Sequence, residues 1–531
     1  MELNVHAGAW GQALEAPVAR GREGGPESLD LRENWPADLQ LWREIERSRE
    51  IEWQRHPGRT SKRLHRRAIL AARSLPVFPG RKVLEIGAGS GIWTAHLASV
   101  LAGRNHLTAA TFNGDLAHKA QSRRLPNTTS ILLKNFESAL SNQTFDYVVA
   151  SDILDDRLYP TVIDTAFRCL KPGGQFIFFA PNATRLTAVF QKVTRLFSRR
   201  DAGAGSPRGV GVQGLRAAAA DWGFRDVEIE FIEVLPAPQS AVGPPIELIL
   251  EKSPIARCFA RSVCFRGAKP GSSPVETPPP TNLAVHHELF GAVSVVVPCH
   301  NEEANIERLV GTLLGMYGDY IREIVIVDDN STDGTAAVGE SLARSNPKVK
   351  LLKRDPPNGV GRALRDGYAA ATGKYILSID CDFVAIASEL HRLFDAVAEG
   401  CDGAVGSRFS PESALVRYPF SKLICNRGYH LLVNLLLGKR VRDASNNLKL
   451  YRAEILKDLD IEENHFAANV ETGLKPLLKN YRIREVPASW INRSAGMGHS
   501  SFNLLGVGPA YLRVLLRTAW RVWRGDYSGC A

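Results

Sequence analysis

Two carboxylates, Asp380 and Asp382, stand shortly after the apolar run Tyr375–Leu377, from which Ser378 and Ile379 separate them. This pattern limits the possible folds of the carboxyl-terminal half of the chain more than any other. The run predicts a buried strand, so the acids would stand where that strand opens into a crevice. Hard divalent cations prefer oxygen ligands, and a cation held there would neutralise a bound diphosphate. Acids spaced in this way also occur in ordinary solvated loops, so the surrounding sequence has to decide between the two interpretations.

Two more strands are predicted upstream, over Val293–Val297 and Glu323–Val327, and polar or acidic residues follow each of them. The stretch Asn358–Gly367 predicts a turn that leads into a helix, because its glycines permit unusual backbone angles. In open α/β sheets, ligands gather at the carboxyl ends of the strands. Three polar strand ends on one sheet edge therefore predict a site for a nucleotide diphosphate.

The order of these motifs resembles the family 2 glycosyltransferases of GT-A fold. The matching stretches are Pro298–Glu303, Asp328–Thr335, Gly359–Gly367 and Asp380–Asp382. A nearer likeness, to the dolichyl- or polyprenyl-phosphate mannosyltransferase branch, is carried by Gly406–Phe409, Asp443–Arg452, Glu485–Pro487 and Asn492–Gly496. The resemblance covers residues 290–505, and it implies transfer of a sugar such as mannose from a nucleotide-diphosphate sugar.

The resemblance also implies roles for individual residues. Asp380 and Asp382 would bind Mg2+ or Mn2+, and Asp382 would take part in catalysis. The implied contacts to the nucleotide sugar are Pro298, Asn301, Glu302, Asp328, Asp329 and Gly361. The implied contacts to an acceptor phosphate are Ser407, Arg408, Lys422 and Arg427. The family further implies inversion by direct displacement at the anomeric carbon.

The nature of the acceptor stays open at this point. A polyprenyl or dolichyl phosphate is already an anionic nucleophile, so it requires cations to position it rather than a strong base. A sugar hydroxyl of a glycan would require a base, and Glu471 is the candidate for that role. The segment Asn446–Lys449 departs from the mannosyltransferase pattern and resembles bacterial family 2 enzymes of envelope polysaccharide assembly, so the sugar is open too.

Two apolar segments carry cations at their ends or among their residues. Leu423–Leu437 lies between Lys422 and the pair Lys439–Arg440, and the tail Tyr511–Trp523 mixes leucine and tryptophan with arginine. Both are too short to span a bilayer and suit helices that lie in a membrane interface, although the first also suits a core helix. We therefore expect a peripheral protein on the cytoplasmic face of a membrane, without a transmembrane helix.

The amino-terminal half contains a second site pattern. The strand Lys82–Ile86 leads into a turn with alternating glycines, and further strands are predicted over Phe145–Ala150 and Gln175–Phe178. Glycines let the backbone approach a ligand closely at the start of a helix. These stretches together resemble class I S-adenosylmethionine-dependent methyltransferases over residues 65–240. The implied contacts to S-adenosylmethionine are Glu85, Gly87, Gly89, Gly91, Thr111 and Asn135.

Thr111 departs from the methyltransferase pattern. These enzymes usually place an acid after the second strand to bind the ribose hydroxyls of the cofactor, whereas a threonine offers a single hydroxyl. The domain is therefore either active or a methyltransferase fold without activity. A further alternative is a membrane-associated methyltransferase whose second domain only binds a glycan or a nucleotide.

Length, charge and cysteine content bound the remaining possibilities. A chain of 531 residues exceeds what one hydrophobic core usually organises. The net charge of +10 is spread among acids rather than gathered in one stripe, so we expect no nucleic-acid partner. The eight cysteines form no C-x-x-C pair, which argues against zinc and a disulfide framework and favours reduced, cytoplasmic thiols.

We expect two Rossmann-like three-layer α/β domains, an amino-terminal methyltransferase-like fold and a carboxyl-terminal GT-A fold. The expected segments are a disordered stretch 1–37, the methyltransferase-like domain 38–250, a proline-rich linker 251–288, the glycosyltransferase domain 289–500 and an amphipathic basic tail 501–531. Within the first domain, residues 39–75 predict helices with an imperfect apolar face that includes Leu41, Ile45 and Trp53.

Overall fold

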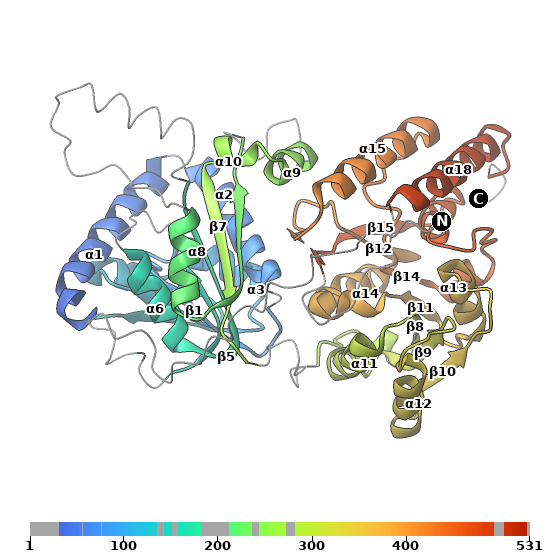
Figure 1. Ribbon diagram of the computed structural model, residues 1–531, viewed down its shortest axis with the longest axis horizontal. Coiled ribbons are helices and arrows are strands. Elements are labelled where there is room, and N and C mark those ends of the chain that lie inside the picture. Colours follow the sequence, from blue (N-terminus) through green and yellow to red (C-terminus); the bar gives the residue numbers. More distant parts are fainter. Residues whose placement is uncertain are drawn as a thin grey trace, which may run out of the picture.

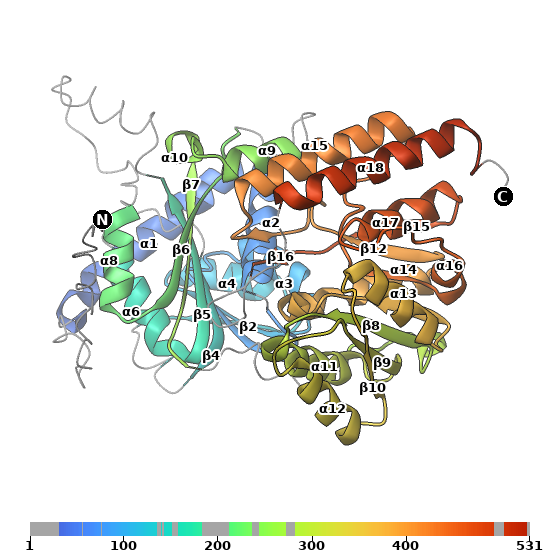
Figure 2. The same ribbon diagram turned by 45° about the vertical axis from the view of Figure 1, so that its right-hand side comes forward.

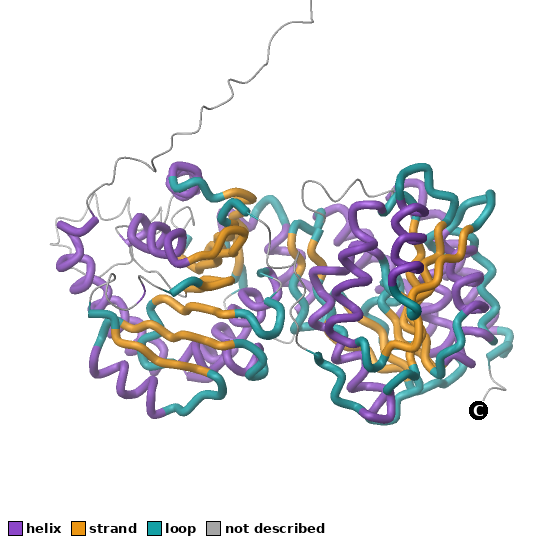
Figure 3. Tube along the Cα trace, turned by 90° about the horizontal axis from the view of Figure 1, so that it is seen from below, coloured by secondary structure: helices purple, strands orange, loops and turns teal. Residues whose placement is uncertain are grey.

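The computed structural model describes residues 31–527, except 56, 76, 135–139, 141–142, 151–157, 183–211, 236–243, 272–281 and 493–503. The described residues form two α/β lobes that lie side by side, one from each half of the chain (Figure 1, Figure 3). Each lobe contains one sheet of seven strands. The predicted fold class, two α/β domains, is confirmed.

The sheet of the first lobe has the strand order β3-β2-β1-β4-β5-β7-β6. Its first five strands are parallel, and β7 is antiparallel to both β5 and β6. The strands are β1 (Lys82–Ile86), β2 (His106–Thr111), β3 (Thr128–Leu132), β4 (Phe145–Ala150), β5 (Leu170–Pro181), β6 (Arg225–Ile232) and β7 (Ser262–Ala268). The helices are α1 (Leu31–Arg55), α2 (Pro57–Ser74), α3 (Ile92–Leu101), α4 (Gly114–Ser122), α6 (Tyr159–Cys169), α8 (Val212–Asp221), α9 (Pro244–Lys252) and α10 (Ala256–Phe259).

The sheet of the second lobe has the order β10-β9-β8-β11-β14-β12-β15, in which β14 is antiparallel to both neighbours. Its strands are β8 (Val293–Cys299), β9 (Ile321–Asp328), β10 (Val349–Lys353), β11 (Tyr375–Ser378), β12 (Gly403–Ser407), β14 (Lys449–Arg452) and β15 (Ile483–Pro487), while β13 (Leu415–Val416) and β16 (Trp490–Ile491) form a separate pair. The helices are η2 (His287–Leu289), α11 (Glu303–Tyr317), α12 (Thr335–Ser345), α13 (Val360–Ala370), η3 (Cys381–Glu389), α14 (His391–Ala398), α15 (Phe420–Leu437), α16 (Ala453–Lys457), α17 (Ala468–Leu478) and α18 (Leu504–Trp523).

Both sheets are covered on their two faces, as expected where parallel pairs dominate. In β8, Val295 and Val297 belong to one apolar core cluster, whereas Val296 between them belongs to another. In β1, Val83 and Leu84 divide between two clusters in the same way. Because side chains alternate across a strand, two clusters separated by a sheet require helices on both faces. Each domain is therefore built in three layers.

The predicted boundary of the first domain at residue 250 lies too early. β7 falls within the predicted linker 251–288, yet it pairs along its length with β5 on one side and β6 on the other. Val263, Cys264 and Phe265 are buried there, so this short apolar run completes the sheet rather than linking two domains. The predicted disordered stretch 1–37 lies outside the described residues, except for residues 31–37, which begin α1.

Helices α15 and α18 lie side by side on the second lobe (Figure 1, Figure 2). Val433 and Leu437 of α15 share a buried cluster with Val514 and Leu515 of α18. The predicted tail 501–531 thus contributes a helix that packs on the second domain. Among the helices that the structure describes, none combines the length and the apolar character needed to cross a bilayer.

Candidate active site

A cavity of about 620 Å³ lies at the edge of the second sheet where β8, β9 and β11 end. Pro298 lines it from β8, Glu302 from the start of α11, and Asp329 from the end of β9. Asp380 and Asp382, which follow β11, line it as well. The three strands are parallel neighbours, so their carboxyl ends bring these five residues to one edge.

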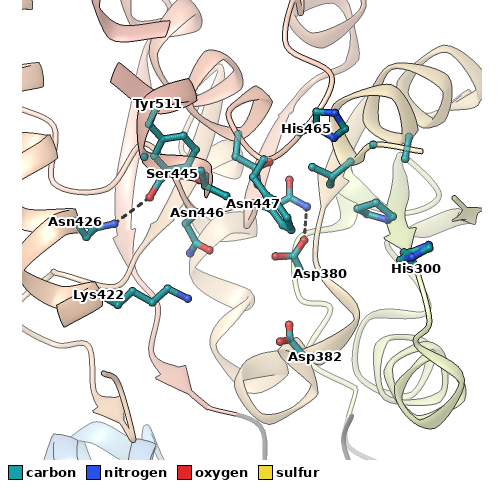
Figure 4. Close-up of a pocket in the computed structure, with 18 of the residues that line it drawn as sticks. His300, Asp380, Asp382, Lys422, Asn426, Ser445, Asn446, Asn447, His465 and Tyr511 are labelled. Atoms are coloured by element: carbon teal, nitrogen blue, oxygen red, sulfur yellow. Dashed lines mark hydrogen bonds between the residues drawn. The ribbon is translucent and has the colours of Figure 1, made fainter. Parts of the chain in front are cut away.

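Asp380 and Asp382 lie close together on one side of the cavity (Figure 4). Asn447 Nδ2 donates a hydrogen bond of 2.7 Å to Asp380 Oδ1. Burial, followed by the negative charge of Asp382, raises the pKa of Asp380 to about 6. A cation bound beside the pair would offset both the burial of Asp380 and its repulsion by Asp382.

The donor set fits a magnesium or manganese ion whose coordination a substrate completes. In the described parts of the chain, no group of three or more histidine, cysteine, aspartate or glutamate side chains is arranged to hold a metal ion. The acid pair would therefore supply two protein ligands and leave the other positions to diphosphate oxygens and water. Mg2+ commonly binds in this way, through one or two carboxylates together with substrate phosphates.

Asp329 connects the end of β9 to the glycine-rich turn before α13. Its Oδ2 accepts a hydrogen bond of 2.6 Å from the backbone N–H of Gly359, and its Oδ1 pairs with Arg354. Gly359 and Asn358 line the same cavity. The turn is thereby held against the end of β9, where it forms part of the cavity wall.

The other three residues predicted to bind the nucleotide sugar do not line the cavity. Asn301 and Asp328 accept hydrogen bonds of 2.8 and 3.3 Å from the backbone N–H groups of Thr332 and Ser331, so both stabilise the loop after β9. Gly361 lies so close to the segment before α17 that a Cβ atom would be 2.2 Å from a carbonyl oxygen. These residues shape the loops that surround the site.

Arg408 and Lys422, two of the predicted contacts to an acceptor phosphate, line the cavity together with the acid pair. Arg408 Nε and Nη2 donate to the carboxylate of Asp443 at 2.7 and 2.8 Å. Although burial acts in the opposite direction, this guanidinium holds the pKa of Asp443 at about 2. Lys422 extends from α15 into the cavity (Figure 4), and burial, followed by the charge of Arg408, lowers its pKa to about 8.

Ser407 and Arg427, the other two predicted contacts to an acceptor phosphate, do not line this cavity. The side chain of Ser407 is buried at the end of β12. Arg427 donates a hydrogen bond of 2.8 Å to the carbonyl oxygen of Arg442, and its guanidinium lies 4.7 Å from the ring centre of Phe409. The structure thus brings two of the four predicted cationic or polar contacts to the site.

Several cavity residues were not predicted from the sequence. They are His300, Asn426, Ser445, Asn446, Asn447, His465 and Tyr511 (Figure 4). Asn446 and Asn447 lie in the segment that departs from the mannosyltransferase pattern. That departure was the sequence feature from which their place at the site could have been predicted. His465 precedes α17 and Tyr511 belongs to α18, so tertiary packing alone brings them to the cavity.

Glu471, the candidate base for a glycan acceptor, does not line the cavity. Its buried carboxylate pairs with Lys475 at 2.9 Å and with Arg517 at 3.0 Å, and it accepts a hydrogen bond of 2.8 Å from the backbone N–H of Glu463. A general base has to reach the proton that it removes. Glu471 instead anchors α18 to α17, so its position does not fit the role suggested from the sequence.

The predicted glycine turn of the first domain lies at the carboxyl end of β1. Positive φ angles occur at Gly87 (76°), Gly89 (57°) and Gly91 (76°). Side chains are disfavoured at such angles, which explains the alternating glycines. Thr111 is the last residue of the neighbouring strand β2. Glu85 lies within β1, and its burial raises the pKa of its carboxyl group to about 7. Asn135, the last predicted contact to S-adenosylmethionine, lies outside the described residues.

The crevice at this turn is filled by helix α1. Gly87 faces the ring of Trp42, where a Cβ atom would lie 2.8 Å from a ring carbon, and Gly89 faces the guanidinium of Arg49. Glycines that were expected to let the backbone approach a cofactor therefore let it approach a helix of the same chain. The residues present do not leave the turn open for S-adenosylmethionine.

Two family models match the chain. The model described as glycosyl transferase family 2 matches residues 294–460, and a model described as a methyltransferase domain matches residues 83–174. The first match contains Pro298, Asp329 and the acid pair, and the second contains the glycine turn and Thr111.

Curated relatives match part of the chain. A polyprenol monophosphomannose synthase from Mycolicibacterium smegmatis is 28% identical over 219 residues, which cover 39% of this chain and 80% of the relative. An undecaprenyl-phosphate mannosyltransferase from Micrococcus luteus is 29% identical over 244 residues, which cover 44% of this chain and 96% of the relative.

Among solved structures, glucosyl-3-phosphoglycerate synthase from Mycobacterium tuberculosis matches with a TM-score of 0.36 and 17% identity, covering 45% of this chain and 85% of that one. Taken with the sheet topology, the family models assign a family to each lobe. The chain joins a methyltransferase-family domain to a domain of glycosyltransferase family 2.

Proposed function

We propose that the second domain is a metal-dependent, inverting glycosyltransferase with a lipid acceptor. It moves a sugar, such as mannose, from a nucleotide-diphosphate sugar to polyprenyl or dolichyl phosphate at the cytoplasmic face of a membrane. One observation carries this proposal: the same cavity contains an acid pair at the strand ends and an apolar wall from two helices. The acids suit a diphosphate with its cation, and the apolar wall suits a prenyl chain.

The apolar wall is formed by residues of α15 and α18. They are Tyr429 and Leu432 of α15 and Val507, Tyr511 and Leu512 of α18. Leu432 and Leu512 are also 43% and 44% exposed, so the wall continues from the cavity onto the outer surface. A long chain whose phosphate lies near Lys422 would leave the cavity along this wall.

The outer sides of the same two helices expose further large apolar side chains. They are Ile424, Leu431 and Leu435 of α15 and Leu516, Trp520 and Trp523 of α18. Single exposed apolar residues are common, whereas a group of them on two adjacent helices marks an interaction surface. The guanidinium of Arg524 lies 4.4 Å from the centre of a Trp520 ring, and arginine with tryptophan is typical of a membrane interface. This surface supports peripheral contact with a lipid bilayer.

The names of the relatives support a lipid acceptor. Two curated relatives, at 28% and 29% identity, are named for polyprenol monophosphomannose synthesis and for undecaprenyl-phosphate mannosyl transfer. The match covers most of the length of each relative. Their acceptors are therefore the first to test.

The cavity residues divide between donor and acceptor in the proposed reaction. Asp380 and Asp382 would hold Mg2+ or Mn2+, which supplies positive charge against the diphosphate of the leaving nucleotide. An oxygen of the acceptor phosphate bonds to the anomeric carbon as the bond from that carbon to the donor diphosphate breaks, and the electron pair leaves with the nucleotide. Attack from the opposite side inverts the anomeric centre. Lys422 and Arg408 orient the anionic acceptor, which needs no base.

A glycan acceptor is the alternative reaction of the same family. It would require a base for the attacking hydroxyl, and the candidate named from the sequence, Glu471, is engaged in buried ion pairs outside the cavity. The geometry therefore favours an acceptor that is already ionised.

Replacement of Asp382 by alanine tests the reaction class. We expect Asp382→Ala to lower transfer of radiolabelled sugar into organic-extractable polyprenyl phosphate by about 100-fold or more, because the lost cation supplies several kcal/mol and about 1.4 kcal/mol is tenfold in rate. A panel of nucleotide sugars with Mg2+ or Mn2+ identifies the donor. Glu307→Ala, which removes an exposed carboxylate of α11 outside the cavity, is the control. If the wild type transfers label to lipid from none of the nucleotide sugars in the panel, the proposal is wrong.

The lowered pKa of Lys422 predicts an alkaline limit to acceptor use. The ammonium loses its proton as the pH rises through about 8, so kcat/KM for polyprenyl phosphate should fall between about pH 7 and pH 9. Arginine stays protonated throughout this range, so Lys422→Arg should remove the decline. An identical alkaline decline in wild type and Lys422→Arg would show that Lys422 does not orient the acceptor.

Replacement of Glu471 by glutamine separates the two acceptor classes. With a structural role for Glu471, Glu471→Gln should keep kcat within about threefold and lower the free energy of unfolding by about 2–4 kcal/mol, because Lys475 and Arg517 lose a buried partner. The control Glu462→Gln changes a partly exposed acid of the same network and should cost under about 1 kcal/mol. A loss in kcat of about 100-fold with unchanged stability would instead identify a base.

A further inference from the structure

The glycine turn and the end of β2 form the crevice in which an open α/β sheet of this kind binds its ligand. In this chain, one face of helix α1 lies in that crevice. Trp42, Glu46 and Arg49 follow one another at spacings of four and three residues, so they project from the same side of the helix. All three are at most 2% exposed. The crevice is thus filled by side chains of the chain itself.

The carboxylate of Glu46 accepts hydrogen bonds from polar groups at the strand ends. It accepts hydrogen bonds from Thr111 Oγ1 at 2.9 Å, from the backbone N–H of Phe112 at 3.2 Å and from that of Asn113 at 3.0 Å. It also accepts one from the backbone N–H of Gly89 at 3.3 Å. These donors belong to the glycine turn and to the end of β2, where a bound nucleoside would require them.

The ring of Trp42 occupies the apolar part of the crevice. It stacks on Phe112, with ring centres 4.5 Å apart and an angle of 21° between the planes. It also contacts Gly87, the first glycine of the turn. An aromatic side chain thus lies beside the carboxylate of Glu46, as a base would lie beside a ribose.

Arg49 and Glu50 complete the contact along the glycine turn. Arg49 donates a hydrogen bond to the carbonyl oxygen of Gly87, and its guanidinium lies 4.8 Å from a ring centre of Trp53. Glu50 accepts a hydrogen bond of 2.6 Å from Ser90 Oγ. Three successive turns of α1 are therefore fixed to the loop between β1 and α3.

The departure at Thr111 fits this arrangement. A carboxylate at position 111 would stand against the buried carboxylate of Glu46, and two like charges without water between them repel strongly. A threonine hydroxyl donates to that carboxylate instead. Thr111 therefore makes the end of β2 less suited to bind a ribose and better suited to contact α1.

Helix α1 is part of the core of the first domain rather than a cover over it. Trp42 and Ile45 belong to the same buried cluster as Leu84 and Ile86 of β1. Displacing the helix would expose this cluster and leave the backbone donors around Glu46 without their acceptor, and both changes are unfavourable.

We infer that α1 is an intramolecular occupant of the cofactor crevice, and that the amino-terminal domain of the full chain does not bind S-adenosylmethionine. Trp42 and Glu46 replace the contacts of the cofactor, so the domain keeps a methyltransferase fold without its cofactor chemistry. The inference is independent of the reaction proposed for the second domain.

Binding of S-adenosylhomocysteine, the stable product form of the cofactor, tests the inference on the full chain. We expect no heat of binding in isothermal titration and no shift in Tm at about 1 mM ligand, a concentration that saturates a micromolar site. Glu44→Ala, which removes an exposed carboxylate from the same helix, should behave like the wild type. Saturable binding by the wild type with a micromolar dissociation constant would overturn the inference.

A double variant, Trp42→Ala with Glu46→Ala, tests whether α1 is what excludes the ligand. If it folds, it should gain binding of S-adenosylhomocysteine, and a folded double variant that still does not bind would overturn the role given to α1. If it does not fold, hydrogen exchange on the ligand-free wild type decides. The amides of Gly89, Phe112 and Asn113 should be protected, since Glu46 accepts their hydrogen bonds, and rapid exchange at all three would refute the contact.

Discussion

Parallel strand packing determines where both crevices of this chain lie. The carboxyl ends of neighbouring parallel strands meet at one edge of a sheet, and backbone donors and loop residues gather there. In the second domain, this edge carries Asp380 and Asp382, and burial, followed by the charge of Asp382, raises the pKa of Asp380 to about 6. In the first domain, the equivalent edge carries backbone N–H groups that the carboxylate of Glu46 already satisfies. One architecture thus gives a crevice suited to a cation and a crevice that is filled.

Buried ion pairs hold the apolar wall of the open cavity in place. Arg408 and Asp443 fix the end of β12 to the segment after α15, and Glu471 with Arg517 fixes α18 to α17. Each pair joins elements that are distant in sequence, and removing one partner would deprive the other of a close opposite charge. These contacts, together with the buried cluster that α15 and α18 share, stabilise the two helices that form the apolar path from Lys422 to the surface.

The sequence predicted the parts of the fold and the site that local patterns determine. Apolar runs followed by acids located the strands and placed Asp329, Asp380 and Asp382 correctly at one edge. The direction in which each side chain points was harder to predict, because it depends on the register of each helix or strand. Ser407 ends β12 with its side chain buried, whereas Arg408 begins the turn that follows and lines the cavity. Arg427 follows Lys422 by five residues, which turns it by about 140° around the helix and away from the cavity.

Contacts between distant elements were beyond what local patterns predict. The buried role of Glu471 requires Arg517 from α18, and the cavity position of His465 requires the packing of the loop before α17. The apolar periodicity of residues 39–75 predicted helices, but it could not show that Glu46 would be buried, because an acid in a helix is normally solvated. Likewise, Val263–Phe265 was too short a run to be recognised as a strand of the first sheet.

We propose that one cavity joins the diphosphate site at the strand ends to an apolar path for a lipid between α15 and α18. Photocrosslinking with a polyprenyl phosphate that carries a photoactivatable group in its prenyl chain tests this claim directly, with mass spectrometry to locate the label. We expect label on residues 425–437 and 507–516, and excess unlabelled polyprenyl phosphate should suppress it. Label elsewhere on the chain, or label on these helices that excess polyprenyl phosphate does not suppress, would refute the lipid path.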